Sequence, residues 1–423
     1  MIANNDLSVK SLILIAFLII ILVVFAAGEE NTPDKETQYL AVTNARLIDG
    51  TGTPPRENMT IIIAGERFEK IGPYGEVSIP EGCKIIDAEG KAVIPGLIDT
   101  HIHFTYPPEE GAFLEYNASS ASFQAAQFLN SYLMVGVTTV RDVCAFQDVG
   151  ITATKAFQKG LFTGSRPIVV GQGITCTGGH GTEGTREGIV VEVDGPAEFR
   201  RAVRQQLKNG ADLIKVLPPY SREEIKAAVE ETHAWEKFVT VHSGVFERQF
   251  DFVRWAVEDG ADCIEHAYAI PDEVIREMGR KGTYCVPTLS VLVTLAEQTK
   301  KRGPEWEWKV QKYLECIEIF KKMRKAGVKM GVGTDYVGEN MKAYPMVYFD
   351  EVEKFVEYGA TPMEAIMAAT KINSEICDAS EEIGTIEKGK LADLLVLEQD
   401  PLRDIKNLKK VEIIIQGGKI VKK

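Results

Sequence analysis

The stretch GLIDTHIH (residues 96–103) joins an apolar run to two histidines two positions apart. Seven further apolar runs rich in β-branched residues follow it, each separated from the next by enough residues for a helix. These runs are GVTTVRD (136–142), RPIVVGQG (166–173), ADLIKVL (211–217), FVTVHS (238–243), ADCIEHAY (261–268), TYCVPTLS (283–290) and VKMGVGTD (328–335). Eight strand–helix repeats predict an α/β fold, a TIM (β/α)8 barrel.

Both flanks of this region have a different pattern, with short strands separated by glycine-containing turns. YLAVTNARLIDG (39–50) and MTIIIAGERFEKIG (59–72) represent the first flank, and VEIIIQGGKIVKK (411–423) the second. Such runs are typical of short antiparallel strands. We therefore predict a small β-sandwich domain built from residues 38–94 and 376–423, with a barrel domain of residues 95–375 inserted into it.

The first residues form a third type of segment. Leu12 to Ala27 is an uninterrupted apolar stretch, preceded by Lys10 and followed by acidic residues. This pattern predicts a signal peptide or membrane anchor over residues 1–28, and cleavage is left open. The remaining chain is then expected outside the cytoplasm, periplasmic, extracellular or anchored facing outward, touching the membrane only through this segment.

The composition indicates which partners to expect. The chain has 423 residues, 45 % of them hydrophobic, and a formal net charge of −13, which is a globular and acidic composition. An acidic surface repels phosphate backbones, so nucleic acid is not an expected partner. The seven cysteines contain no CxxC pair, and we interpret them as buried thiols. A homo-oligomer is left open.

Ionisable side chains at the ends of the predicted strands carry the chemistry. Barrel strands are apolar on both faces, and their carboxyl ends form the active face of this fold. His101 and His103 share one face of the first strand, as two ligands of one metal ion require. The other such residues are Lys215, His242, His266 and Asp335 on strands four, five, six and eight.

Lys215 is the least expected of these side chains. An ammonium group directed into a barrel interior is costly to desolvate without a partner. Reaction with carbon dioxide would convert its amine into a carbamate, a carboxylate able to bridge two cations.

These motifs together resemble the metal-dependent amidohydrolase superfamily. The likeness runs from about Ala41 to the C-terminus, and VIPGLIDTHIHF (93–104) is its entry motif. GVTTVRD, TGGHG (177–181) and IEHAY (264–268) resemble its imidazolonepropionase-like and Xaa-Pro dipeptidase (prolidase)-like branch. The resemblance implies a hydrolase with a barrel and a split β domain.

The resemblance also implies a site with two divalent metal ions. His101, His103 and Asp335 would hold the more buried cation, His242 and His266 the more exposed one, and carboxylated Lys215 with a hydroxide would bridge both. Carbon dioxide is then required for lysine carboxylation. Zinc is the first choice, although manganese, cobalt or iron fit the same ligands. Asp335 is expected to move the proton from the hydroxide to the leaving nitrogen.

Substrate residues are expected in the loops after the strands. His180 and Tyr220 match positions that hold the substrate α-carboxylate in dipeptidase-like relatives. The loops or their neighbourhood also carry Arg248, Tyr336, Lys342 and Tyr344, a mixture suited to an anionic end group. Arg141 and Asp142 are expected to pair with each other or to brace the pocket.

We therefore predict a hydrolase that cleaves a C–N amide bond of a small substrate with a metal-bridging hydroxide. The substrate would be a dipeptide such as Xaa-Pro or an N-acyl amino acid. One alternative is a mononuclear imidazolonepropionase- or deaminase-type hydrolase of a cyclic amide or amidine, whose relatives lack the strand-four lysine. Another is a catalytically silent binding barrel, against which the full ligand set argues.

Overall fold

The computed structural model describes residues 38–107, 116–183, 188–244 and 251–423. The chain divides into two compact units, residues 1–38 and 39–423, and the described helices and strands belong to the second. The predicted signal or anchor over residues 1–28 lies outside the described residues. Within the described ranges, no helix has both the length and the apolar character needed to cross a membrane.

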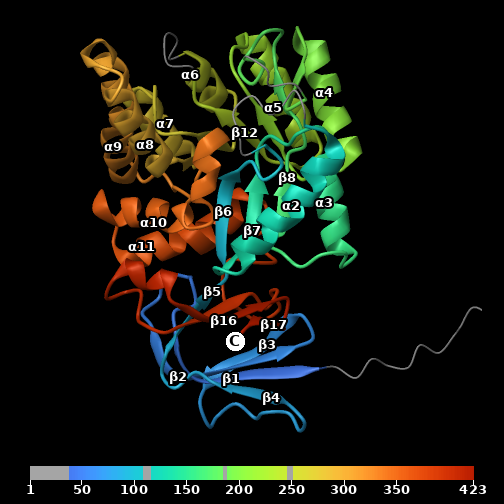
Figure 1. Ribbon diagram of the computed structural model, residues 1–423, viewed down its shortest axis with the longest axis vertical. Helices are drawn as coiled ribbons and strands as arrows, with labels where there is room; N and C mark the ends of the chain where they lie inside the picture. The colour runs from blue at the N-terminus through green and yellow to red at the C-terminus, as the bar shows by residue number, and fades with distance from the viewer. Residues whose placement is uncertain (1–37, 108–115, 184–187, 245–250) are drawn as a thin grey trace, which may run out of the picture. The chain divides into compact units, whose positions relative to one another are not determined.

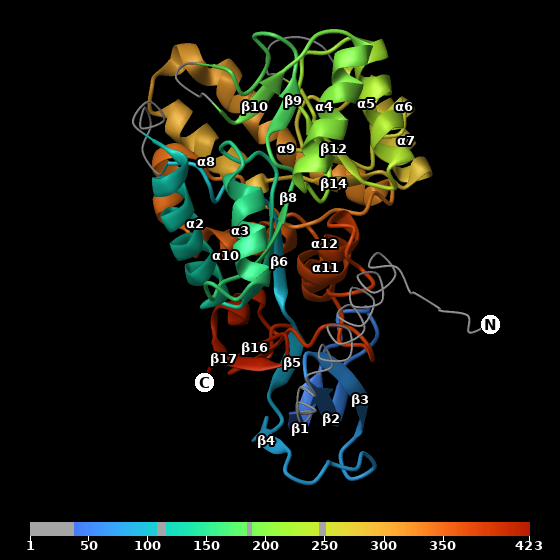
Figure 2. The same ribbon diagram turned by 90° about the vertical axis from the view of Figure 1, so that its right-hand side faces the viewer.

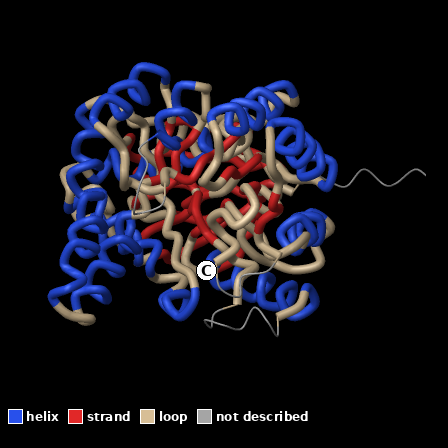
Figure 3. The backbone as a smooth tube through the Cα atoms, turned by 90° about the horizontal axis from the view of Figure 1, so that it is seen from above, coloured by secondary structure: helices blue, strands red, loops and turns tan. Residues whose placement is uncertain are grey.

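Parallel strands form the centre of this unit, and helices surround them (Figure 3). One sheet has the order β6-β7-β8, and another has the order β10-β9-β11-β12-β13-β14. The first sheet comprises β6 (Leu97–Ile102), β7 (Val137–Asp142) and β8 (Arg166–Val169). The second comprises β9 (Gly173–Thr175), β10 (Val190–Glu192), β11 (Ile214–Val216), β12 (Val239–His242), β13 (Cys263–Glu265) and β14 (Tyr284–Val286).

The eighth predicted strand, residues 328–335, is not a regular strand. Its ladder pairing is limited to a bridge between Cys285 and Met330. The segment still closes the barrel, because Gly331 N–H donates to Cys285 O and Thr100 N–H donates to Val332 O. A Cβ on Gly333 would lie 2.7 Å from His101 Cβ, so only glycine permits this close approach.

Helices follow the barrel strands along the chain and give the barrel its outer layer (Figures 1 and 3). Ser221 and Glu224 form a capping box at the start of α5. The helices are α2 (Ala118–Leu133), α3 (Val149–Gln158), α4 (Pro196–Asn209), α5 (Arg222–Ala234), α6 (Asp251–Glu258), α7 (Asp272–Lys281), α8 (Leu289–Lys300), α9 (Glu307–Lys325), α10 (Val347–Glu357), α11 (Pro362–Met367) and α12 (Asn373–Ile376).

Both flanks of the barrel region contribute to one eight-stranded sheet, the β-sandwich part of the fold (Figure 1). Its order is β17-β16-β15-β5-β1-β2-β3, and β4 pairs with β1. The expectation of purely antiparallel strands is wrong, because β1 pairs in parallel with β4 and β5. The strands are β1 (Tyr39–Leu47), β2 (Arg56–Ala64), β3 (Arg67–Pro73), β4 (Lys84–Asp87), β5 (Ala92–Pro95), β15 (Leu394–Leu397), β16 (Val411–Gln416) and β17 (Lys419–Lys422).

This sheet contacts the amino ends of the barrel strands (Figure 2). Gln416 Nε2 donates to Thr138 O at 2.8 Å and to Gly164 O at 3.1 Å, near the starts of β7 and β8. Arg166, the first residue of β8, pairs with Asp393 at 2.6 Å. The carboxyl ends of the same strands lie at the opposite end of the barrel from this sheet. All seven cysteines are free thiols, and five of them are buried.

Candidate metal centre

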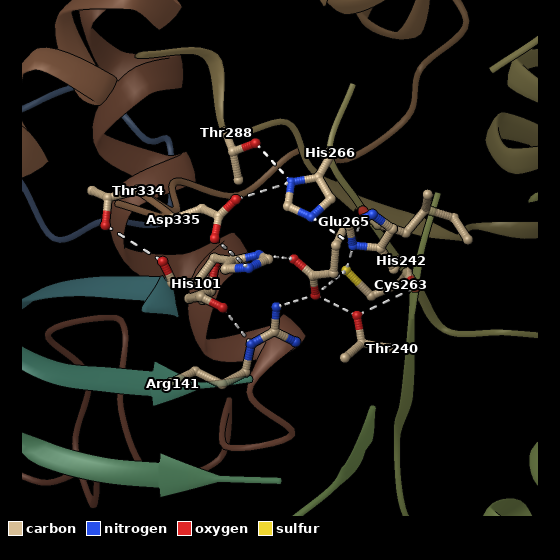
Figure 4. A network of polar contacts seen from close by, with 12 residues as sticks. His101, Arg141, Thr240, His242, Cys263, Glu265, His266, Thr288, Thr334 and Asp335 are labelled. Carbon is tan, nitrogen blue, oxygen red and sulfur yellow. Dashed lines mark hydrogen bonds and ion pairs between the residues drawn. The ribbon is translucent and has the colours of Figure 1, made fainter. Parts of the chain in front are cut away.

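A cavity of about 180 Å³ lies at the carboxyl ends of the barrel strands. Polar side chains on its strand side include the predicted ligands, several of which appear in Figure 4. Its lining also contains apolar side chains from the surrounding segments, among them Val143, Ile189, Leu217, Val291, Leu292, Leu295 and Val337. The cavity therefore has a polar wall that could bind metal and an apolar wall.

His101, His103 and Asp335 converge on one point of the polar wall. Asp335 Oδ1 lies 3.3 Å from His101 Nε2 and 3.2 Å from His103 Nε2. One ligand atom from each residue lies within 4.8 Å of the other two, a spacing that suits a single cation. The three residues come from β6, the position just after it and the irregular closing segment.

Asp99 holds this trio together through the backbone. Its Oδ1 accepts the N–H groups of His101 and Thr334, and its Oδ2 accepts the Thr334 hydroxyl at 2.9 Å. Asp99 shares the inward face of β6 with both histidines because side chains alternate along a strand. Burial raises the pKa of Asp99 to about 7. One carboxyl group thus ties the end of β6 to the residue before Asp335.

His242 and His266 form a second pair. His266 Nε2 lies 3.0 Å from His242 Nδ1, and both rings are buried. In a regular strand, Glu265 and His266 would point to opposite faces. His266 has a φ of 74°, which ends the extended conformation and lets both side chains reach the centre.

His101 and His103 each use one ring nitrogen for a protein acceptor. His101 Nδ1 lies 2.7 Å from the Glu265 carboxylate, and His103 Nδ1 lies 3.3 Å from Cys144 O. Both partners only accept hydrogen bonds, so both Nδ1 atoms carry the proton. Nε2 of each ring faces Asp335, so a cation bound between them would take the lone pair of Nε2 while the proton stays on Nδ1.

His242 and His266 also each have one ring nitrogen on an outer partner. In His242 this nitrogen is Nε2, and in His266 it is Nδ1. Tyr268 donates its single hydroxyl proton to Gly244 O, so it accepts from His242 Nε2 at 2.7 Å. The lone pair of His242 is then on Nδ1, directed at His266. His266 Nδ1 lies 2.9 Å from the Thr288 hydroxyl, which leaves Nε2 directed at His242. Ring orientation set by an outer partner is typical of metal-binding histidines.

Lys215 lies on β11 and lines the same cavity. Its Nζ is buried and has no hydrogen-bond partner among the described residues. Burial lowers the pKa of the amine. A buried nitrogen without a partner is costly, so this position calls for a further group in the cavity.

Glu265 and Arg141 form a buried ion pair behind the ligands (Figure 4). Arg141 Nη2 donates to Glu265 Oε1 at 2.5 Å, and both side chains are fully buried. Burial would raise the pKa of Glu265, but the positive charges of Arg141 and Lys215 outweigh it and hold that pKa well below its usual range. Of the two expectations for Arg141, pairing with Asp142 is wrong, because Arg141 pairs with Glu265 across the barrel; bracing the pocket agrees with that contact.

Residues 92–421 match the model of the Amidohydrolase family. The chain belongs to the amidohydrolase family. This confirms the predicted family, and with it a hydrolase that acts on C–N bonds.

Several proteins are similar to this amidohydrolase over most of its length. Ochratoxinase of Aspergillus niger is 28% identical and covers 92% of this chain and 87% of its own. Imidazolonepropionase of Symbiobacterium thermophilum is 24% identical, covering 78% of this chain and 81% of its own. A crystal structure of a Xaa-Pro dipeptidase with bound methionine in the active site is 29% identical, with a TM-score of 0.81, over 91% of this chain and all of that one.

The amidohydrolase structure brings the six predicted ligand residues and His180 into the lining of one cavity. The ring centroids of His180 and His242 are 4.4 Å apart. Glu183 accepts from His180 Nδ1 at 2.6 Å, which leaves Nε2 of that ring for a ligand.

Other predicted substrate residues lie elsewhere. Tyr220 is buried and donates its hydroxyl to Phe252 O at 3.1 Å, and it is not among the residues that line the cavity. The hydroxyl of Tyr344 contacts Thr334 and Tyr336. Neither Tyr220 nor Tyr344 therefore presents a free phenol to the cavity. Tyr336 and Lys342 are also not among its lining residues. Arg248 lies outside the described residues.

Sequence reasoning missed three residues that orient ligands, namely Asp99, Glu265 and Tyr268. Asp99 had a readable signal, because it precedes His101 by two positions and shares its face. Glu265 and Tyr268 flank His266 in the IEHAY motif. Strand alternation places Glu265 outside the barrel, and the positive φ of His266 is what brings it inside.

Proposed function

We propose that this amidohydrolase hydrolyses the C–N amide bond of a small substrate, a dipeptide such as Xaa-Pro or an N-acyl amino acid, with two divalent cations. One observation carries this proposal. Each of the four histidine rings has one nitrogen on a protein partner and the other directed inward, around the partnerless Nζ of Lys215.

The donor set fits two cations. Imidazole nitrogens and carboxylate oxygens are ligands that zinc prefers, and manganese, cobalt and iron also accept them. His101, His103 and Asp335 would hold one ion, His242 and His266 the other. Cations bound there would activate water at neutral pH and polarise the substrate carbonyl.

Lys215 would bridge the two positions as a carbamate. Its nitrogen would form a bond to the carbon of carbon dioxide and release one proton to solvent. The product is a carboxylate, which removes the partnerless amine from the cavity. The geometry supports this role, because Lys215 lies on β11, which pairs with the strand of His242, and it lines the same cavity as His101 and His103.

Asp335 would move protons during turnover. Its carboxylate contacts His101 and His103 through Oδ1, and Oδ2 lies 3.6 Å from His266 Nδ1. The side chain is 22% exposed, so it also faces the space that a substrate enters. It is placed to take a proton from the attacking water and to deliver it to the leaving nitrogen.

The two walls of the cavity support a substrate with one anionic and one apolar end. His180 lines the cavity with its Nδ1 on Glu183, and its Nε2 would hold the substrate carboxylate. Val291, Leu292 and Leu295 form one face of α8, which lines the apolar wall. We propose that this face holds an aliphatic or aromatic side chain of the substrate.

A matched substrate library tests this function. L-Xaa-L-Xaa dipeptides and N-acetyl amino acids are each assayed beside their C-terminal amides on the zinc-loaded protein. We expect the free acids to react at least about tenfold faster, since a lost charged contact costs about 2 to 5 kcal/mol. His180→Gln should slow the acids and leave the amides unchanged. Equal rates for acids and amides would contradict the carboxylate site.

A one-metal hydrolase of a cyclic amide is the second candidate. The observation that favours it is that His101, His103 and Asp335 alone form a compact ligand cluster among the described residues. Lys215 argues against it, because a one-metal site gives no partner to that nitrogen. Metal counting separates the two.

A further inference from the structure

We propose that Glu265 is a positioning residue that couples the two cation positions. Its side chain would keep His101 ready for one cation, while its main chain holds the strand ends that carry His242 and His266. This inference rests on the proposed two-metal centre.

The two oxygens of Glu265 serve different partners. Oε1 accepts from Arg141 Nη2 at 2.5 Å and from the Thr240 hydroxyl. Oε2 accepts from His101 Nδ1 at 2.7 Å. Compensating the buried charge of Arg141 requires only Oε1, so the contact to His101 has a separate role. That role is to keep the proton of His101 on Nδ1 and its lone pair on Nε2.

Arg141 keeps this carboxylate in place. Its Nε donates to Thr100 O at 2.6 Å, the peptide oxygen directly before His101. Its guanidinium therefore contacts both the main chain of β6 and the carboxylate from β13. The pair fixes the distance between the strand that bears His101 and the strand that leads to His266.

The main chain of Glu265 reaches the second pair of histidines. Glu265 is the register partner of His242 between β12 and β13, and its carbonyl accepts from Ser243 N–H at 3.0 Å. His266 is the next residue, and its N–H donates to Val286 O. A shift of Glu265 would therefore move His101 through the side chain and both other histidines through the backbone.

Glu265→Gln removes the carboxylate charge and reverses the hydrogen bond to His101, while it keeps the size of the side chain. Arg141 only donates, so the amide oxygen of glutamine is expected to face Arg141 and its NH2 group to face His101. His101 Nδ1 would then have to accept, which moves the ring proton to Nε2 and removes the ligand lone pair. The side chain keeps its size and one hydrogen bond to Arg141.

Asp262→Asn is the matched control. Asp262 precedes β13, and its carboxylate accepts from His233 Nε2 at 2.9 Å in an equivalent but partly exposed pair outside the cavity. The same oxygen accepts from Val239 N–H at 2.8 Å, a bond that the amide oxygen of asparagine can keep. The substitution removes a carboxylate–histidine contact from the same segment without touching the centre.

The test is zinc binding to the full chain freed of metal, by competition with a chelator and by metal counting. We expect wild type and Asp262→Asn to bind two zinc ions alike. Glu265→Gln should bind zinc about 10- to 100-fold more weakly at both positions, because the neutral amide reverses the hydrogen bond to His101 and holds Arg141, and with it the spacing of β6 and β13, less firmly. Wild-type affinity at both positions in Glu265→Gln, or weakening at one alone, would overturn the coupling. Fewer than two zinc ions in wild type would instead overturn the proposed centre.

A second measurement needs no folded variant at Glu265. Nitrogen NMR of zinc-loaded wild type, with labelled histidine and the His101 signals assigned from a His101→Gln sample, reports which ring nitrogen carries the proton. We expect a proton on Nδ1 of His101. A proton on Nε2 would overturn the proposal.

Discussion

Glu265 Oε2 lies 2.7 Å from Nδ1 of His101, although the two residues are 164 positions apart in the chain. The contact crosses the barrel from β13 to β6 and joins the two groups of candidate ligands. The geometry of the centre therefore depends on residues behind the ligands as well as on the ligands themselves.

Asp335→Asn should lower the turnover rate far more than the zinc content. The amide keeps an oxygen ligand but cannot take up a proton, so we expect turnover to fall by about 10²- to 10⁴-fold while zinc content stays near wild type. Steady-state kinetics beside metal analysis of the same sample measures both. Near-native turnover in this variant would rule out Asp335 as the proton carrier.

Tyr268→Phe and Tyr220→Phe should have different effects, because the Tyr268 hydroxyl positions His242 and the Tyr220 hydroxyl has a structural role. Tyr268→Phe removes the acceptor for His242 Nε2, and we expect zinc affinity to fall about tenfold. Tyr220→Phe removes only the bond to Phe252 O, and we expect about 1 kcal/mol less stability with unchanged KM. Chelator competition measures the zinc affinity, urea unfolding the stability and steady-state kinetics the KM. A raised KM in Tyr220→Phe would restore the predicted substrate role.

Glu351 should make stability depend on pH. It is buried, and it accepts the N–H groups of Leu289 and Ser290 at the start of α8. Burial raises its pKa to about 7 from an ordinary value of 4.5. The folded state then retains a proton that the unfolded state has lost, so the stability contributed by Glu351 falls as pH rises from 4.5 to about 7.

Urea unfolding of wild type and Glu351→Gln at about pH 5 and about pH 8 measures this effect. We expect the free energy of unfolding of wild type, relative to the variant, to drop by about 1 to 3 kcal/mol between the two conditions. A difference that is independent of pH would show that Glu351 does not titrate in this range.

The sequence predicted the ligand residues because they break a simple rule. Barrel strands are apolar, so His101, Lys215 and His242 are conspicuous at strand ends. Alternation then placed His101 and His103 on one face. The same rule failed for Glu265, because the backbone of His266 leaves the extended conformation at that point.

The remaining differences also have local causes. The closing segment was predicted to be a strand, but Gly333 lies too close to His101 and Val286, and Gly331 too close to Asn373 and Ile376, for side chains at these positions. The parallel pairing of β1 with β4 and β5 depends on long connections that carry no pattern of their own. Residue type alone did not reveal that the hydroxyl of Tyr220 donates a hydrogen bond to Phe252 O.

The location of the protein stays a prediction. Because Leu12 to Ala27 is apolar and follows Lys10, we propose that the catalytic unit works outside the cytoplasm. Cell fractionation of the full chain and of a chain lacking residues 1–28 tests this. We expect only the full chain in the exported or membrane fraction. Full-length protein that stays soluble in the cytoplasm would contradict the proposal.

The number of metal ions per chain tests the central claim most directly. Protein reconstituted with zinc and bicarbonate is analysed for zinc, together with Lys215→Ala and the surface control Lys226→Ala on α5. We expect two zinc ions in wild type and Lys226→Ala, and fewer than two in Lys215→Ala with most activity lost, because both positions lose their shared ligand. One zinc ion per wild-type chain, with an unmodified Lys215 amine, would contradict the two-metal centre.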